Sequence, residues 1–204
     1  MTALLSTAYF PNIEYILKFI SYNNILIEQH ENYIKKTYRN RCNILTANGI
    51  SILSVPVIQN KETKTSVKDI KISYAENWQK NHLTALVSAY SSSPFFEFYI
   101  DDFKHLFTKK YERLLSYNIE ILKIILSTIG IEKKIKLTTD FIPIENNYND
   151  FRFSISKNRN NNYNKKYTQV FSEKYSFQPN LSILDVIFNL GPESILYLKS
   201  LQND

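Results

Sequence analysis

The pattern of apolar residues at the start of the chain predicts a strand, a helix and a second strand. Residues 3–8 are mostly apolar, and the run ends before Pro11, which cannot donate a hydrogen bond inside a sheet. Apolar residues then follow Ile13 at intervals of three, four and seven positions, which is helical spacing, and Asn12 precedes them as an N-cap. Residues 25–27 are again apolar. Two strands joined by one helix form a β-α-β unit, whose right-handed crossover makes the strands parallel.

The next part of the chain predicts a β-hairpin and then a helical middle section. Residues 41–45 and 50–55 are strand candidates around Asn48-Gly49, a pair typical of a type I′ turn with positive φ at both central residues. Residues 67–73 alternate imperfectly, as in an edge strand. The expected helical signals are Asn77 as a helix start, Ser93 as an N-cap with Pro94 at the first position, and a helix over 111–129 that ends at Gly130.

The last part of the chain predicts two short strands and two short helices. Residues 135–138 and 151–155 have strand character, and the second run alternates cleanly. Residues 157–166 contain a run of asparagines and are expected to form a solvated loop. Ser182 and Asp185 form a capping box that starts a short helix. Gly191-Pro192 ends that helix and starts the last one.

Composition narrows the fold and the kinds of site that the chain can carry. With 204 residues the chain can bury one core, so we predict a single domain over residues 1–204. Only three glycines are present, which excludes glycine-rich phosphate loops. Cys42 has no second cysteine to pair with and is expected to be buried as a small apolar residue. The predicted fold is α/β, a small mixed sheet with the N-terminal β-α-β unit, the Asn-Gly hairpin and the helical middle section.

The positive charge does not by itself indicate a nucleic-acid partner. The net charge is +6, but acidic residues are interspersed among the lysines and no compact basic stripe accompanies them. The most apolar window, residues 119–131, contains Glu120 and Lys123 and is too short to span a bilayer. No signal peptide is visible. We therefore expect a cytoplasmic protein without a membrane span, and the sequence leaves its oligomeric state open.

Residues 28–41 concentrate long functional side chains between the second strand and the hairpin. Ordinary loops are short and rich in small residues, so this density favours a binding or catalytic site. In open α/β sheets, ligands bind beyond the carboxyl ends of parallel strands. Residues that follow the first two strands include Tyr9 and His30, which we expect on one rim of the sheet.

His30 and Glu31 have the residue types of a general base and the acid that orients it. An imidazole titrates near neutrality, as the activation of an amine or hydroxyl acceptor requires. The alternative is a loop histidine that hydrogen-bonds to the backbone. Metal binding is not predicted, because His30-Glu31 lacks the second histidine of a zinc motif and the three histidines are far apart. No cofactor is predicted either.

Lys35, Arg39, Asn40 and Arg41 are candidates for holding a phosphate or carboxylate. Guanidinium groups offer paired donors to such anions. If residues 38–45 are extended, Arg39 and Arg41 point to the same face and present two forks to one anion. The alternative is a solvated edge strand whose charges discourage aggregation.

Aromatic residues supply the remaining candidates for ligand contacts. Tyr9, Tyr33 and Tyr38 have the chemistry to stack on a sugar or base, although each of the 15 tyrosines is individually more typical of packing. Trp78 and His82 lie four residues apart in a helix and have the spacing to pair over a ligand. An apolar stripe at helical spacing favours the core for both.

Several short stretches resemble the WbqC-like protein family, in order along nearly the whole chain. They are Leu5 to Pro11 with Tyr15, Gln29 to Tyr33, Lys35, Tyr38 to Arg41, Asn48-Gly49, Leu53, Val55-Pro56, Trp78 with His82, Ala89-Tyr90, Ser93 to Phe96, Gln178 to Ser182, and Asn189 to Pro192. The resemblance implies a link to bacterial surface-polysaccharide (O-antigen) gene clusters, and a glycine or aminoacyl transferase role has been suggested for such proteins. Some members carry an acidic stretch where this chain has His30-Glu31.

The sequence therefore leaves two main hypotheses. The first is a transferase that moves an acyl or aminoacyl group, for example glycyl, to an amino sugar or similar acceptor, with His30 as base and Arg39 and Arg41 holding the anionic part of a small-molecule or sugar-linked substrate. The alternative is a non-catalytic binding module for an anionic or nucleotide-linked metabolite. A nucleic-acid binder is a third reading and would lose affinity steeply with salt.

Overall fold

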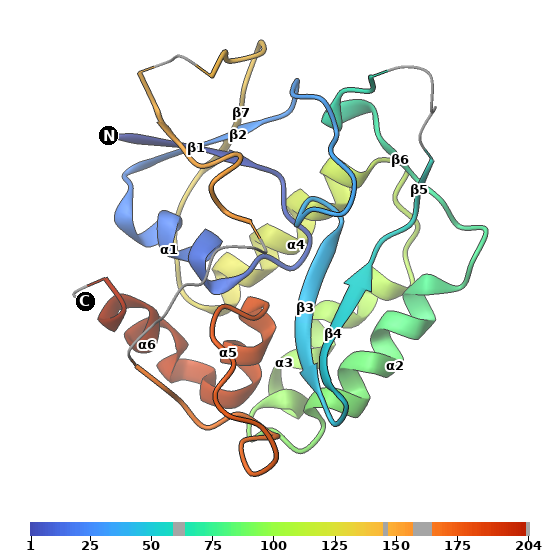
Figure 1. The fold of residues 1–204 in the computed structure, drawn as a ribbon, viewed down its shortest axis with the longest axis vertical. Coiled ribbons are helices and arrows are strands. Elements are labelled where there is room, and N and C mark those ends of the chain that lie inside the picture. The colour runs from blue at the N-terminus through green and yellow to red at the C-terminus, as the bar shows by residue number, and fades with distance from the viewer. Residues whose placement is uncertain (59–63, 145–146, 157–164, 203–204) are drawn as a thin grey trace.

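The computed structural model describes residues 1–58, 64–144, 147–156 and 165–202 (Figure 1). The first strand of its main sheet is β1 (Thr2–Ser6), which pairs parallel with β2 (Asn24–Glu28). The helix α1 (Ile13–Ser21) connects the two strands along the chain. The predicted β-α-β unit is confirmed. Two short strands, β7 (Ile135–Leu137) and β8 (Asn149–Asp150), extend the sheet in the order β7-β2-β1-β8, and every pair is parallel.

The helix α1 forms where the sequence predicts it, and it packs against the sheet. The side chain of Asn12 accepts a hydrogen bond from the backbone N–H of Tyr15, which satisfies one of the unpaired donors at the helix start. Ile13 and Ile16 are fully buried, which removes one apolar face of the helix from water. The chain enters α1 through Phe10, which is fully buried and has a positive φ of 37°. This turn carries the chain away from the carboxyl end of β1.

The hairpin is present, but its turn differs from the predicted type I′ geometry. β3 (Arg41–Thr46) and β4 (Gly49–Ser54) pair antiparallel with Thr46 opposite Gly49, so Ala47 and Asn48 form the loop. Gly49 has a φ of 94°, whereas Asn48 does not have a positive φ. One left-handed glycine after the loop gives the bulged hairpin turn, and the hydroxyl of Thr46 supports it by donating to the carbonyl of Gly49.

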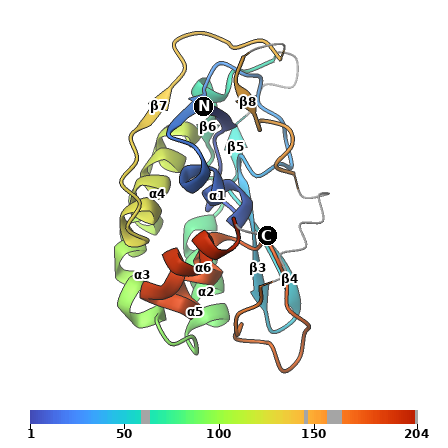
Figure 2. The same ribbon diagram turned by 90° about the vertical axis from the view of Figure 1, so that its left-hand side faces the viewer.

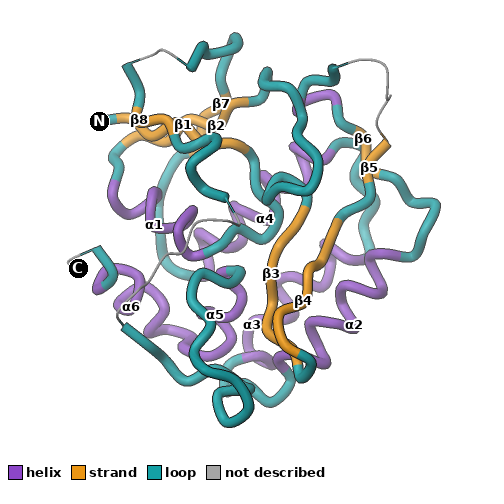
Figure 3. Tube along the Cα trace, viewed as in Figure 1, coloured by secondary structure: helices purple, strands orange, loops and turns teal. Residues whose placement is uncertain are grey.

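The remaining elements place a helical layer beside the hairpin. The helices are α2 (Trp78–Tyr90), α3 (Phe96–Lys104), α4 (Leu114–Thr128), α5 (Ile183–Leu190) and α6 (Ser194–Ser200), with short 3₁₀ turns at Val67–Asp69, His105–Phe107 and Gly191–Glu193. Figure 2 shows these helices on one side and the hairpin on the other. A small antiparallel pair, β5 (Val57–Ile58) with β6 (Lys71–Ile72), lies apart from both sheets (Figure 3).

The α/β class and the helical middle section are thus confirmed, and several local predictions need correction. Residues 67–73 form a 3₁₀ turn followed by the short β6. Ser93 does not cap α3, because its hydroxyl donates to the carbonyl of Tyr90 and the helix begins later, at Phe96. Strand β8 lies just before the predicted run 151–155, which instead turns.

At the C-terminal end, half of the predicted capping box is present. Ser182 caps α5, but the carboxylate of Asp185 accepts hydrogen bonds from Tyr167 and Gln169. The predicted solvated loop 157–166 falls mostly outside the described residues.

The buried core joins the sheet to the helices through aromatic side chains. The ring of Phe10 stacks on Phe107 with centroids 5.9 Å apart and meets Phe103 edge-on, and Phe103 in turn contacts Phe188 of α5. Such aromatic pairs bury large apolar areas and fix the angle between elements. Among the described residues, no helix is long and apolar enough to cross a membrane.

Candidate functional site

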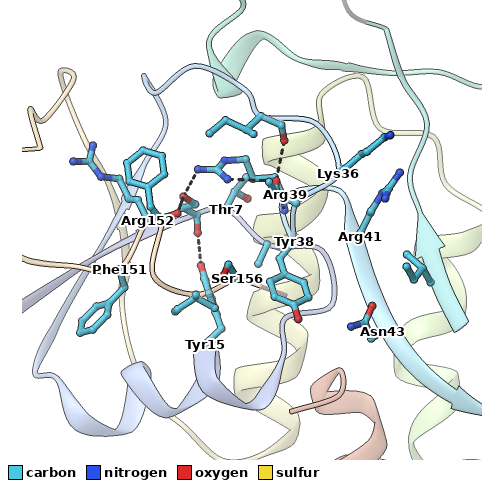
Figure 4. Close-up of a pocket in the computed structure, with 17 residues that line it drawn as sticks. Thr7, Tyr15, Lys36, Tyr38, Arg39, Arg41, Asn43, Phe151, Arg152 and Ser156 are labelled. Atoms are coloured by element: carbon cyan, nitrogen blue, oxygen red, sulfur yellow. Dashed lines mark hydrogen bonds between the residues drawn. The ribbon is translucent and has the colours of Figure 1, made fainter. Parts of the chain in front are cut away.

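A pocket of about 230 Å³ opens at the carboxyl ends of the parallel strands β1 and β8 (Figure 4). This is the edge at which open α/β sheets bind ligands. The described residues that line it come from three segments that follow β1, β2 and β8, together with α1 and the hairpin. They are Ser6, Thr7, Ala8, Tyr15, Ile34, Lys36, Thr37, Tyr38, Arg39, Arg41, Asn43, Ile52, Phe151, Arg152, Phe153, Ile155 and Ser156.

Arg39 is fixed in the wall of the pocket by a buried ion pair with Glu31. Its Nε donates to Oε1 of Glu31 at 2.9 Å, and its Nη2 donates to Oε2 at 2.7 Å. The same Nη2 donates to the hydroxyl of Ser6 at 2.7 Å, and Nη1 donates to the hydroxyl of Thr37 at 3.3 Å. The charge of the guanidinium is therefore neutralised, and most of its N–H donors already make hydrogen bonds. This holds the group rigid and leaves it little capacity to bind a ligand by itself.

Arg152 is held on the opposite wall by a second buried cluster. Its Nη2 donates to Asp150 at 2.6 Å, and its Nη1 contacts Glu28 at 3.3 Å, with the side chains of both Arg152 and Glu28 fully buried. The backbone carbonyls of Ile142 and Pro143 accept further hydrogen bonds. Glu28 ends β2 and also accepts from Thr138 after β7, so one carboxylate ties three strand ends together.

The two remaining cations that line the pocket, Lys36 and Arg41, have no acidic partner within the described part of the chain. The Nε of Arg41 is buried and makes no hydrogen bond with any residue that the structure describes. Figure 4 draws both side chains on the same side of the pocket, with Asn43 below them on β3. A buried donor without a partner is costly unless a ligand satisfies it.

The backbone at Lys36 is unusual as well. Lys36 has a φ of 60°, a left-handed conformation that is strained for any residue other than glycine, and such strain gathers at binding sites. The conformation sets the direction in which the Lys36 side chain leaves the loop, beside the mouth of the pocket.

The rest of the lining combines aromatic rings and hydroxyl groups with aliphatic side chains and the amide of Asn43. The hydroxyl of Tyr15 donates to the carbonyl of Ser6 at 2.9 Å, and burial raises the pKa of Tyr15 above its ordinary value. Burial also raises the pKa of Tyr38. The ring of Phe153 lies near both Arg39 and Arg152, with the guanidinium carbons 5.9 and 5.8 Å from its centroid. Rings and hydroxyls of this kind suit a sugar or another ring with polar edges.

The structure does not place His30 and Glu31 as a catalytic pair. Both carboxylate oxygens of Glu31 are taken by Arg39, and Nδ1 of His30 instead lies 3.3 Å from Nζ of Lys68. His30 does not line the pocket, and its Nε2 is buried with no hydrogen-bond partner in the described ranges. The sequence expectation that Glu31 orients His30 is therefore corrected, and Glu31 orients Arg39.

Three predicted ligand contacts lie in the core instead. The hydroxyl of Tyr9 is 2.8 Å from Nδ1 of His82, and the ring of Trp78 meets that histidine edge-on at 5.2 Å. All three are buried, and Nε1 of Trp78 donates to the carbonyl of Ser73. Burial lowers the pKa of His82 to about 4. Trp78 and His82 therefore lie in the core, as the alternative interpretation of the sequence has it, and Tyr9 lies there with them.

The other predicted residues divide between the pocket and its surroundings. Arg39, Arg41 and Tyr38 line the pocket, although β3 begins only at Arg41, so the two arginines reach it from a turn and a strand rather than from one extended face. Asn40 is structural, because its amide donates to the carbonyl of Val55. Lys35 is exposed and does not line the pocket.

Tyr33 does not line the pocket. It is buried outside the pocket lining, and burial raises its pKa to about 12 against the opposing effect of Arg39 and Arg41. Cys42 is buried, and this raises the pKa of its thiol. Among the described residues, no group of three or more His, Cys, Asp or Glu side chains could hold a metal ion.

Sequence reasoning missed Lys36, Tyr15 and Arg152 as site residues. Lys36 adjoins Lys35, and only the left-handed turn decides which of the two lines the pocket. Arg152 lies within a run that reads as a strand, and its acidic partner Glu28 is 124 residues away. Tyr15 belongs to the helical periodicity of α1, and its side chain reaches the pocket only because α1 starts beside the end of β1.

Similarity to known proteins extends over most of the chain. Residues 7–164 and 148–197 match the sequence profile of the WbqC-like protein family. The chain is also 25% identical over 222 residues to the uncharacterized protein Rv1507c of Mycobacterium tuberculosis (strain ATCC 25618 / H37Rv). This alignment covers 94% of the chain and 91% of the relative. No solved structure matches the chain.

Proposed function

The chain belongs to the WbqC-like protein family, and we propose that its pocket binds a small, sugar-linked substrate through an anionic group. One observation carries this proposal. Within the described part of the chain, four cationic side chains and no carboxylate line the pocket, and the two cations without an acidic partner there, Lys36 and Arg41, lie on the same side of it. A phosphate or carboxylate there would gain charge-assisted hydrogen bonds and relieve the repulsion between like charges.

The reaction that we propose at this site is the transfer of an acyl or aminoacyl group, for example glycyl, in the biosynthesis of bacterial surface polysaccharide. The fixed guanidinium of Arg39 would orient the substrate, and Tyr15, Tyr38 and Phe151 would contact its ring. Holding a substrate and a donor in one orientation can by itself supply a large part of a rate enhancement. The cytoplasm would supply both reactants.

One observation favours the alternative, a non-catalytic binding module. Among the residues that the structure describes, the lining offers no histidine and no carboxylate as a general base, and burial raises the pKa of both Tyr15 and Tyr38. His30, the base expected from sequence, lies outside the lining. A His30→Gln variant tests whether His30 acts as a general base. Loss of turnover with intact ligand binding would support a catalytic role for His30.

Calorimetric titration of the full chain tests the anion site. We expect glucose 6-phosphate to bind and glucose to bind far more weakly, because only the phosphate reaches Lys36 and Arg41. Arg41→Gln should weaken glucose 6-phosphate binding about tenfold or more, as expected for the loss of a charge-assisted hydrogen bond. Lys35→Gln removes an exposed lysine beside the site and should leave the affinity unchanged. Equal affinities for glucose and its phosphate would contradict the proposal.

A further inference from the structure

We infer that the substrate carries a hydrocarbon group next to its anion, and that three exposed apolar side chains at the mouth of the pocket hold this group. The inference rests on the proposed function and narrows its substrate class to an amphipathic ligand, with a sugar, an anion and a hydrocarbon group. The three side chains belong to Ile34, Ile52 and Phe153, which together form the apolar rim.

The members of the apolar rim line the pocket and also face water. Ile34 is 42% exposed, Ile52 is 53% exposed and Phe153 is 51% exposed, so each belongs both to the lining and to the surface around the mouth. Single exposed apolar residues are common on protein surfaces, whereas several around one opening are typical of a binding site. The free protein thus keeps apolar area in water at the place where a ligand enters.

Two members of the rim lie next to the cations that have no acidic partner among the described residues. Ile34 precedes Lys36 by two residues, and both line the pocket. In the hairpin, Ile52 is paired with Asn43, which lies on the same strand face as Arg41. A ligand whose anion contacts Lys36 and Arg41 therefore lies against Ile34 and Ile52 as well.

Phe153 completes the rim from the segment after β8. Its ring centroid lies 5.9 Å from the guanidinium carbon of Arg39 and 5.8 Å from that of Arg152. Both guanidinium groups are paired with carboxylates, so this wall offers a ligand its apolar side chains rather than free charge. The apolar alternation around Phe153, which forms no strand, places Phe151 and Ile155 in the lining too.

A hydrocarbon group gains more from the apolar rim than a polar group does. Burial of apolar surface is favourable in proportion to the area removed from water. A sugar hydroxyl placed against the rim would instead lose hydrogen bonds to water without replacement. The sugar therefore lies further inside, against the buried Tyr15 and the half-buried Tyr38, and the hydrocarbon group lies at the mouth.

Calorimetry of the full chain with methyl, butyl and hexyl phosphate tests the inference. The three probes share one phosphate and differ only in the length of their hydrocarbon chain. Complete burial of a methylene raises affinity about fourfold, and half burial raises it about twofold. We therefore expect hexyl phosphate to bind roughly 30-fold more tightly than methyl phosphate, from the half burial of five methylenes.

Variants of the rim show whether these residues hold the chain. Ile52→Thr should reduce the gain from methyl to hexyl phosphate by about twofold or more, and it should leave the affinity for methyl phosphate unchanged. Phe153→Ser should reduce the gain as well. The matched control Ile50→Thr removes an equally exposed isoleucine from the same face of β4, outside the pocket lining, and should leave the gain as it is. An unchanged gain in both rim variants would contradict the inference.

The remaining outcomes separate the inference from the proposed function. If glucose 6-phosphate binds and hexyl phosphate binds no more tightly than methyl phosphate, the inference is wrong while the anion site stands. Sedimentation with vesicles of phosphatidylcholine and phosphatidic acid adds a further arm. Vesicle binding without any effect of chain length would assign the apolar rim to a membrane surface and overturn the inference. If neither glucose 6-phosphate nor any alkyl phosphate binds, the proposed function and the inference are both wrong.

Discussion

Arg39 donates two hydrogen bonds, of 2.9 and 2.7 Å, to the carboxylate of Glu31, and both side chains are almost completely buried. The pair sets one wall of the pocket, because Arg39 also donates to Ser6 at the end of β1. In this way a carboxylate that the sequence offers as the orienting partner of His30 acts instead to position a cation. Its substitution should therefore affect folding as well as binding.

Glu31→Gln should destabilise the protein by about 3–5 kcal/mol, because it leaves the guanidinium of Arg39 buried without its counter-charge. Urea denaturation followed by circular dichroism measures the change in the free energy of unfolding. The control is Glu112→Gln, which breaks a surface pair with Lys71 in which both side chains are more than half exposed, and it should have no measurable effect. Equal stability of the two variants would show that the buried pair is dispensable.

Lys36→Gly should separate stability from binding. Lys36 has a φ of 60°, and relief of its strain by about 1 kcal/mol should offset the entropy that a glycine loses on folding. The variant should then be as stable as the parent, while its affinity for glucose 6-phosphate falls. Lys35→Gly, next to it and without a positive φ, should lose about 0.5–1 kcal/mol and keep its affinity. A clear loss of stability in Lys36→Gly would count against strain at this position.

His82 should make the protein less stable in mild acid. Burial lowers its pKa in the folded state to about 4, below the ordinary value near 6.5, so the unfolded chain binds its proton first. The stability that the neutral ring contributes is complete above pH of about 6.5 and is lost as the pH falls towards about 4, by up to about 3 kcal/mol.

Unfolding titrations across this pH range measure the slope of stability against pH. His82→Gln should flatten the curve in this window, even if the variant is less stable throughout. His105→Gln, at an exposed position, should leave the slope as it is. An unchanged slope in His82→Gln would assign the acid sensitivity to other groups.

Gly191→Ala should be more harmful than the same change at Gly130. Both glycines have positive φ, of 52° and 71°, so each substitution carries about 1–2 kcal/mol of backbone strain. At Gly191 the new Cβ would also lie 2.5 Å from ring atoms of Phe95, whereas nothing lies within 4 Å at Gly130. Overpacking of this kind adds about 1–3 kcal/mol. Thermal unfolding of both variants compares the two, and equal melting temperatures would mean that Phe95 moves aside freely.

The local elements of this fold follow from the sequence because their causes are local. The apolar spacing of α1 and the cap at Asn12 predict that helix, and two apolar runs on either side predict the parallel pair β1 and β2. Gly130 and Gly191 end helices through left-handed backbone that other residues adopt only with strain. Even here the pattern misleads where tertiary contacts compete. Residues 151–155 alternate as a strand does, yet they turn at the mouth of the pocket, with the backbone N–H of Phe151 bonded to Leu4.

The site itself depends on contacts between distant parts of the chain. The sequence alone determines that residues 28–41 carry an excess of polar and cationic side chains after a strand, and Arg39, Arg41 and Tyr38 do line the pocket. Only the tertiary structure decides which charges are neutralised. Glu31 and Glu28 pair with Arg39 and Arg152 across separations of 8 and 124 residues, and this leaves Lys36 and Arg41 without acidic partners among the residues that the structure describes. Periodicity identifies the face of an element, whereas the pairing of charges depends on how the strand ends come together in space.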